Sequence, residues 1–117
     1  MEQINKIELR GTVGFVRSQT INGRTVVRIS VATNYVYKDR SGEPVIETTW
    51  HNVSAWEGKG TQDILRIEKG SKVQVTGRLR GQRYTDSEGV DRYSYEVVAY
   101  TLNIIEDQTP LQYEFPG

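Results

Sequence analysis

Apolar side chains recur at every second position along most of this chain, and a period of two is the pattern of β-strands rather than helices. The first run has its apolar positions at Ile7, Leu9, Val13 and Phe15. An Asn-Gly pair at positions 22 and 23 predicts a turn, and a β-branched run then alternates from Thr25 to Thr33. The alternation therefore predicts two strands, each with its apolar side chains on one face.

A third strand is predicted for ETTWHNVSAW, which holds both tryptophans and the only histidine. Side chains at even positions of a strand share one face, so Trp50 and Trp56 lie together among polar neighbours. The other face carries residues of odd number, among them His51 and the core candidates Val53 and Ala55. A strand with its largest apolar rings on its more polar face needs an explanation other than ordinary core packing.

The period changes after this strand, where TQDILRIEKG predicts the one helix. Thr61 suits the N-cap, Lys69 the last turn and Gly70 the position after the end of the helix. The side chains expected to face the core are Ile64, Leu65 and Ile67.

Alternation resumes in a fourth strand, whose predicted inward positions are Val73, Val75, Gly77 and Leu79. Its outward positions begin at Lys72 and continue through Arg78 and Arg80 to Tyr84. TDSEGVD predicts a hairpin loop after it, and RYSYEVVAYTLNII predicts a fifth and final strand.

Five strands with a helix between the third and the fourth are the order of an all-β OB-fold, a five-stranded Greek-key barrel. The same count also fits another small barrel or an α+β sheet, so the pattern alone leaves these alternatives open. The length of 117 residues suits a single domain. We expect this domain to span residues 1–105, followed by a short, flexible acidic segment at 106–117.

The composition limits the cellular compartments and the kinds of partner that we expect for this chain. The chain has no cysteine, no apolar run long enough for a membrane span and no signal-peptide pattern at its start, which predicts a cytoplasmic protein without membrane contact. Its charges are unevenly distributed: residues 1–92 hold all 15 basic residues and 11 acidic ones, whereas residues 93–117 hold four acidic residues and no basic one. A mildly basic body is compatible with an acidic partner, although surfaces of mixed charge are common.

Catalysis finds little support in the sequence. His51 is the only histidine, and without cysteine a zinc site would have to consist of carboxylates alone. The chain contains neither a glycine-rich phosphate loop nor a nucleophile elbow. Asp86, Glu88 and Asp91 lie close together, but in a hairpin loop such residues usually stabilise the turn. The sequence therefore predicts no enzyme, no metal and no cofactor.

The aromatic and basic residues are more informative. Trp50 and Trp56 share one strand face, Tyr84 follows Arg78 and Arg80, and Tyr35 and Tyr37 lead into a loop with Lys38 and Arg40. Single-stranded nucleic acid is bound by this combination, because basic grooves follow phosphates and aromatic faces stack bases. Alternatively, the tryptophans belong to the core or to a subunit interface, and the arginines to a solvated strand face.

Several spaced motifs resemble the bacterial single-stranded DNA-binding proteins of the homotetrameric OB-fold type. They are NKIELRGTVG, VATNYVYKD, TTWHNVSAW and EKGSKVQVTGRLRGQRYTDSEGVDRYSYEVV. Together they span about residues 5–105 in the order found in that family. The resemblance implies a non-catalytic homotetramer that binds single-stranded DNA without sequence preference in replication, recombination or repair.

The resemblance also implies roles for individual residues. Base-stacking aromatics fall on Tyr37, Trp50, Trp56 and Tyr84, and residues at or beside phosphate contacts are Lys38, Arg80 and Arg83, to which the strand pattern adds Arg78. His51 falls near the subunit interface, and Tyr93 is expected to be structural. Asn52, Ser54 and Ala55 depart from the family pattern, so the resemblance does not define the contacts along that strand.

The C-terminus departs most from the family. Many members continue into a long Gly/Pro/Gln-rich tail whose acidic tip ends in Ile/Leu-Pro-Phe and recruits replication and repair enzymes. Here EDQTPLQYEFPG follows Ile105, so ordinary recruitment through this terminus is not expected. A short form from a phage or mobile element and a truncated chain are equally compatible with this ending. The alternative function is an OB-fold protein-interaction module, such as a primosome-type accessory subunit.

Overall fold

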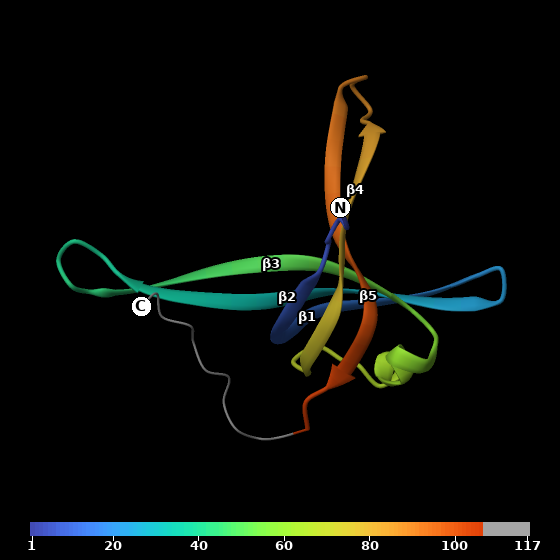
Figure 1. Ribbon diagram of the computed structural model, residues 1–117, viewed down its shortest axis with the longest axis horizontal. Coiled ribbons are helices and arrows are strands. Elements are labelled where there is room, and N and C mark those ends of the chain that lie inside the picture. Colours follow the sequence, from blue (N-terminus) through green and yellow to red (C-terminus); the bar gives the residue numbers. More distant parts are fainter. Residues whose placement is uncertain (107–117) are drawn as a thin grey trace.

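The computed structural model describes residues 1–106, which form five strands and one short helix (Figure 1). The strands are β1 (Ile7–Ile21), β2 (Arg24–Lys38), β3 (Pro44–Trp56), β4 (Lys72–Thr85) and β5 (Asp91–Ile104). A 3₁₀ helix, η1 (Lys59–Leu65), lies between β3 and β4. The predicted number and order of elements is confirmed. The predicted acidic C-terminal segment lies, apart from Glu106, outside the described residues.

The five strands close into a barrel in the order β1-β2-β3-β5-β4. The β1–β2, β1–β4, β2–β3 and β4–β5 pairs are antiparallel, whereas β3 and β5 meet in a short parallel pairing at Val53 and Ser54. This is the predicted OB-fold, because the barrel is closed, has five strands and places its one helix between the third and the fourth.

The core fills the barrel interior with the alternate apolar residues of all five strands. Its main members are Leu9, Val13, Val27, Ile29, Val31, Val53, Ala55, Val73, Val75, Val97 and Leu102. Val53 and Ala55, the core candidates of β3, are only 2% and 1% exposed. The period of two therefore placed the interior of the barrel correctly over most of its length.

Helix η1 packs against β5 at one end of the barrel (Figure 1). The Oδ2 atom of Asp63 accepts a hydrogen bond from the backbone N–H of Ile104 at 3.0 Å, which ties the helix to the end of β5. The helix begins earlier than predicted, so Thr61 is not its N-cap. Thr61 is instead buried within it, and its hydroxyl donates to the backbone carbonyl of Trp56.

The helix also ends earlier than predicted, at Leu65, so Lys69 and Gly70 follow it without belonging to it. Ile64 and Ile67 are buried as expected, but Leu65 is 74% exposed, and its assignment to the core was wrong. In a 3₁₀ turn of three residues, neighbouring positions point in different directions, so Ile64 faces the core and Leu65 points away. Ile67 lies beyond the end of the helix.

Strand β1 contains a β-bulge at Gly14 and Phe15, where two residues lie opposite a single residue of β2, Ser30. The flanking pairs are Val13 with Val31 and Val16 with Ile29. The extra residue reverses the alternation, so Phe15 lies on the outer surface and is 50% exposed. The prediction that Phe15 shares a face with Val13 was wrong. The backbone N–H of Phe15 donates to the hydroxyl of Ser30 at 3.0 Å, which holds the bulge in place.

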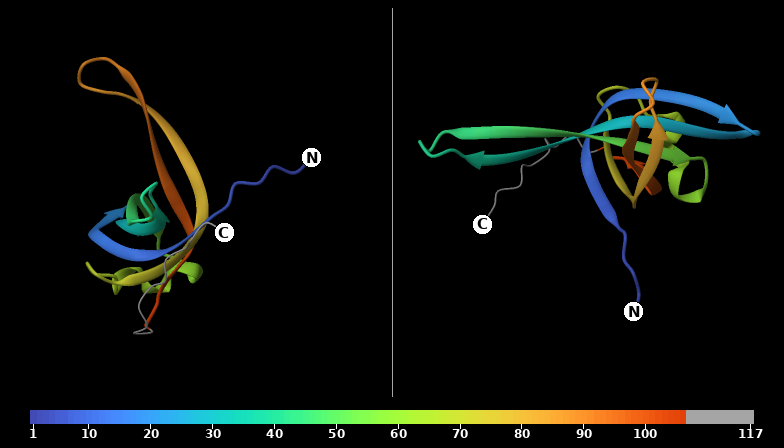
Figure 2. Two further views of the ribbon diagram at one scale, coloured as in Figure 1. Left: turned by 90° about the vertical axis from the view of Figure 1, so that its left-hand side faces the viewer. Right: turned by 90° about the horizontal axis from the view of Figure 1, so that it is seen from above.

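Three hairpins extend from the barrel in different directions (Figures 1 and 2). The β1–β2 hairpin turns at Asn22 and Gly23, both with positive φ (51° and 78°), as a two-residue hairpin requires. The β2–β3 and β4–β5 hairpins are the other two. Leu79, predicted to face inward, is 44% exposed because it lies on the β4–β5 hairpin beyond the last β1–β4 pair, Ile7 with Gly77.

Candidate nucleic-acid interface

The outer surface of β1, β2 and β3 is the part of the molecule where both tryptophans lie. The register pairs Trp50 with Ala32 and Trp56 with Val26, and it places Asn52 and Ser54 on the same face between them. This confirms the face predicted from alternation. Six residues of extended strand separate the two tryptophans by about 20 Å.

Trp50 is 60% exposed and lies over Gly14 of the β1 bulge. A Cβ atom at Gly14 would be 2.5 Å from Cζ3 of the indole and 2.7 Å from the hydroxyl oxygen of Ser30. The absence of a side chain at position 14 therefore allows the ring to lie close to the β1 backbone. The ring borders a surface hollow of about 440 Å³, lined by Gly14, Phe15, Ser30, Trp50, Asn52 and Lys69.

Trp56 has a different environment. It is partly buried, and its cross-strand partner Val26 is fully buried although it lies on the outer face. The guanidinium carbon of Arg24 lies 5.2 Å from the centre of the Trp56 ring, within the range of a cation–π contact. The Trp56 ring therefore already has a cation over one of its faces, whereas more of the Trp50 ring is exposed to solvent.

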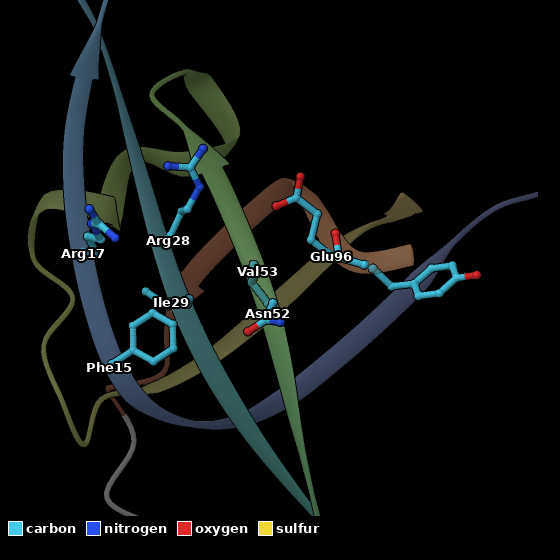
Figure 3. A pocket seen from close by; sticks show the side chains of 9 residues that line it. Phe15, Arg17, Arg28, Ile29, Asn52, Val53 and Glu96 are labelled. Atoms are coloured by element: carbon cyan, nitrogen blue, oxygen red, sulfur yellow. The ribbon is translucent and has the colours of Figure 1, made fainter. Parts of the chain in front are cut away.

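The bulge adds Phe15 to this surface, and a second hollow of about 270 Å³ begins beside it. Figure 3 shows Phe15 and Arg17 on β1, Arg28 on β2 and Asn52 on β3 around this hollow. Phe15 and Asn52 line both hollows, so the two are neighbours on one surface. The sequence analysis did not predict Phe15, Arg17, Arg28 or Lys69 as site residues. The bulge did have a signal in the sequence, because two apolar residues in succession, Phe15 and Val16, interrupt the alternation.

The electrostatics of this surface favour anions. The outward positions of β1 from Gly14 onward, and those of β2 and β3, include no Asp or Glu. They do include four basic residues, which are Arg17, Arg24, Arg28 and Lys38. We call this carboxylate-free surface, with Trp50, Trp56 and Phe15, the outer aromatic face. Exposed rings among basic side chains can stack bases and neutralise phosphates.

The β4–β5 hairpin carries the other predicted arginines, divided between its two faces. Arg78, Arg80 and Tyr84 share one face, as predicted, whereas Arg83 lies on the opposite face with Tyr93 and Tyr95. The Nη1 atom of Arg80 is 3.3 Å from Oε1 of Glu96, and Arg83 pairs with Asp91. The structure therefore does not bring Arg83 together with Tyr84 and Arg80 on one surface.

The end of this hairpin is held by Asp86. Its Oδ1 atom accepts hydrogen bonds from the backbone N–H groups of Glu88 and Val90, and its Oδ2 atom pairs with Arg92. The bond from Arg92, followed by those from the backbone, lowers the pKa of Asp86 below its usual value of 3.8. These contacts confirm that Asp86 stabilises the turn, as predicted for the acidic residues of this loop.

The predicted residues of the β2–β3 hairpin lie near its end. Tyr37 packs beside Tyr35, with ring centres 6.1 Å apart and planes inclined by 33°. Both tyrosines lie, by alternation, on the face of the hairpin opposite to Trp50, whereas Lys38 is on the Trp50 side. Tyr37 and Trp50 therefore do not form one continuous surface on a single face of this hairpin.

His51 lies on the opposite face of β3 from the tryptophans, as predicted. Its Nε2 atom is 2.8 Å from the hydroxyl oxygen of Thr33 on the neighbouring strand. Partial burial lowers the pKa of His51 below its usual value of 6.5, because desolvation disfavours the charged imidazolium. His51 is therefore separated from the outer aromatic face by the sheet itself.

Metal binding and membrane insertion are two other functions to consider for residues 1–106. His, Asp and Glu side chains there form no group of three or more that could hold a metal ion. None of the helical structure in the same residues has the length and apolar character needed to cross a bilayer.

Comparison with known proteins finds relatives over almost the whole chain. Residues 4–105 match the model of the Single-strand binding protein family. The chain is 36% identical over 104 residues to the single-stranded DNA-binding protein of Xanthomonas campestris pv. campestris, and 30% identical over 106 residues to that of Neisseria meningitidis serogroup A. Both alignments cover 87% of this chain and 60% of the relative, so the chain spans about 60% of the length of these curated relatives.

Solved structures show the same fold. The Plasmodium falciparum SSB in complex with ssDNA is similar with a TM-score of 0.76 and 25% identity, covering 91% of this chain and 98% of that one. A deletion mutant of the single-stranded DNA binding protein from Thermus aquaticus has a TM-score of 0.72 at 19% identity, covering 90% and 52%. The second similarity supports the fold alone.

Proposed function

This chain belongs to the single-strand binding protein family, and we propose that it binds single-stranded DNA largely without regard to sequence. The observation that supports this most is the outer aromatic face, where exposed Trp50 and Phe15 lie among basic residues and the outward positions of β1 from Gly14 onward, of β2 and of β3 carry no carboxylate. A base stacked on an indole gains contact whatever its identity, because every base has a π face. Arginine and lysine neutralise the phosphates and so add affinity without reading bases.

The remaining predicted residues extend this proposal to two hairpins. Lys38 lies on the Trp50 side of the β2–β3 hairpin, so a strand that leaves Trp50 could continue toward it. Tyr84, Arg78 and Arg80 form a second aromatic and basic surface on the β4–β5 hairpin. Tyr37 and Arg83 lie on other faces, and their contacts with DNA would require the strand to wrap around the hairpins.

Such binding requires no chemical step. The protein would cover exposed single strands during replication, recombination or repair at the nucleoid, and it would release them as salt rises. The binding of single strands is supported by the relatives of this chain, which are single-stranded DNA-binding proteins. The affinity should fall steeply with salt, because each neutralised phosphate releases counterions.

A titration with oligo-dT, followed by tryptophan fluorescence at low salt, tests the proposal. Bases that cover Trp50 should quench its emission, and Trp50→Ala should weaken binding by about 1–3 kcal/mol. Tyr100→Ala is a matched control, since Tyr100 is an exposed aromatic (56%) on β5, which is not one of the strands that form the outer aromatic face. Absence of quenching, with unchanged anisotropy of a labelled oligo-dT, would contradict the proposal.

We also propose that the chain assembles into a homotetramer with His51 near a subunit contact. The resemblance of the sequence to homotetrameric relatives supports this, and so does the position of His51 on the face that DNA would not cover. Light scattering of the free protein measures the mass directly. A monomeric mass at micromolar concentration would contradict the proposed assembly and leave DNA binding to be tested separately.

A further inference from the structure

Between the two tryptophans, the outer aromatic face carries another aromatic ring and a pair of arginines. Along β2, the cross-strand partner of Trp50 is Ala32 and that of Trp56 is Val26. Between these positions, Ser30 faces the Phe15 bulge and Arg28 pairs with Arg17. The register therefore gives the order Trp50, Phe15, the Arg17–Arg28 pair, and Trp56.

The two arginines lie directly opposite one another on neighbouring strands. Like charges in this arrangement repel, which weakens the strand pair unless an anion or a carboxylate compensates. Arg17 has no ion-pair partner among residues 1–106, and Arg28 donates through Nη1 to the neutral side chain of Gln19 at 2.9 Å. The Arg17–Arg28 pair is therefore uncompensated within the described part of the chain.

Carboxylates near the pair do not change this conclusion. Glu96 lines the same hollow, but its Oε1 atom lies 3.3 Å from Nη1 of Arg80, which neutralises it. Figure 3 shows Glu96 on the far side of the hollow from Phe15. The basic side of the hollow is thus formed by Arg17 of β1 and Arg28 of β2, and its carboxylate, Glu96, is already paired with Arg80.

An exposed aromatic ring beside two uncompensated arginines can bind both the base and the phosphate of a nucleotide. Phe15 presents a phenyl face on which a base can stack, and the arginines provide guanidinium groups suited to a phosphate. The bulge is what places the ring here, since regular alternation would have turned Phe15 toward the core. The hollow of about 270 Å³ beside Phe15 is open to solvent on one side, as a site for one unit of a passing strand would be.

We propose that Phe15, Arg17 and Arg28 form a nucleotide subsite on β1 and β2 that continues the path of single-stranded DNA from Trp50 toward Trp56. The base stacks on Phe15 and the adjoining phosphate lies between Arg17 and Arg28. This subsite rests on the proposed function, since its occupant is a nucleotide of the same strand. It extends the binding surface from β3 across to the first strand of the barrel.

The test for the base is Phe15→Leu, which keeps an apolar side chain of similar size but removes the ring. The dissociation constant for oligo-dT should rise about five- to 150-fold, and Phe15→Tyr should restore it. Tyr100→Ala is the control for loss of an exposed aromatic elsewhere. An affinity for Phe15→Leu equal to that of the wild type, with circular dichroism unchanged, overturns the stacking role.

The test for the phosphate is the salt dependence of binding. Each phosphate neutralised on a single strand contributes about 0.7 to the slope of log affinity against log salt, so Arg17→Gln/Arg28→Gln, which leaves one phosphate without its cations, should lower the slope by about 0.7. Arg10→Gln, a change of charge on β1 where it faces β4, should leave the slope unchanged. Equal slopes for the double variant and the wild type overturn the phosphate role.

These outcomes separate the subsite from the function on which it rests. If the wild-type protein does not bind oligo-dT at low salt, the proposed function and the subsite are both wrong. If the wild type binds and the variants at Phe15, Arg17 and Arg28 bind equally well with the same salt slope, the subsite alone is wrong. Thermal melting of each variant shows whether a loss of affinity reflects a loss of fold.

Discussion

At the scale of single residues, Trp50 and Trp56 should contribute differently to stability. Trp50 is mostly exposed, so its replacement removes little buried area. Trp56 lies beside fully buried Val26 and beneath Arg24, so Trp56→Ala should expose apolar surface and remove a cation–π contact. We expect Trp56→Ala to lower the free energy of unfolding by about 1–2 kcal/mol and Trp50→Ala by less than about 0.5 kcal/mol. Urea denaturation followed by circular dichroism measures both.

The same difference bears on affinity. A base reaches Trp50 without displacing anything, whereas at Trp56 it must join or displace the guanidinium of Arg24. Trp50→Ala should therefore cost more binding free energy than Trp56→Ala in stable protein. The reverse ranking at low salt would show that Trp56 is the main stacking ring and that Arg24 assists it.

Gly14 offers a second prediction at this scale. An alanine there would bring its Cβ within 3 Å of the Trp50 ring and of the Ser30 hydroxyl, so the indole must move off β1. We expect Gly14→Ala to shift the tryptophan emission, to weaken oligo-dT binding and to cost about 1–3 kcal/mol of stability. Gly58→Ala is the matched control, since Gly58 has an extended backbone and its nearest neighbour to an added Cβ is 3.9 Å away. Identical emission and affinity in both variants would show that the ring is not seated on Gly14.

At the scale of elements, alternation predicted five strands and the interior of the barrel. This worked because each strand of a closed barrel turns one apolar face inward, and regular pairing preserves that face along most of the strand. It failed where a strand departs from regular pairing. Phe15 left the core face at a bulge that depends on how β1 meets β2, and Leu79 is exposed because the β1–β4 pairing stops at Gly77. Alternation places the neighbours Arg83 and Tyr84 on opposite faces of the strand, whereas the family resemblance assigned both of them to DNA binding.

The turn between β4 and β5 gives a prediction about pH. The pKa of Asp86 in the folded protein is lowered by its bonds from Arg92 and from the backbone, so its ionised form stabilises the hairpin. This contribution is fully present above the unfolded pKa of about 3.8 and is lost as the pH falls through the lower folded value. Asp86→Asn should therefore lower the melting temperature at pH 7 more than at pH 2. Equal losses at both pH values would show that the charge of Asp86 does not hold the turn.

At the scale of the whole molecule, the outer aromatic face belongs to β1, β2 and β3, whereas the surface with Arg78, Arg80 and Tyr84 belongs to the β4–β5 hairpin. Figure 2 shows the β2–β3 and β4–β5 hairpins extending in different directions, so one straight strand cannot follow both. The sequence could not reveal this, because distances between hairpins depend on barrel closure and on the parallel contact of β3 with β5 at Val53 and Ser54. A strand that uses all these surfaces must bend, which favours wrapping over a linear groove.

Assembly of the whole protein should respond to mild acid through His51. Its partial burial lowers its pKa, so the neutral form is favoured in the folded protein and protonation is opposed. The stability that depends on neutral His51 is fully present above pH 6.5 and is lost as the pH falls from there through the lower folded value. If His51 lies at a subunit contact, the proposed tetramer should weaken as the pH falls below 6.5, and His51→Gln should remove this dependence. Light scattering as the pH is lowered measures it, and a mass that is constant with pH, or equally pH-dependent in His51→Gln, would place His51 away from the contact.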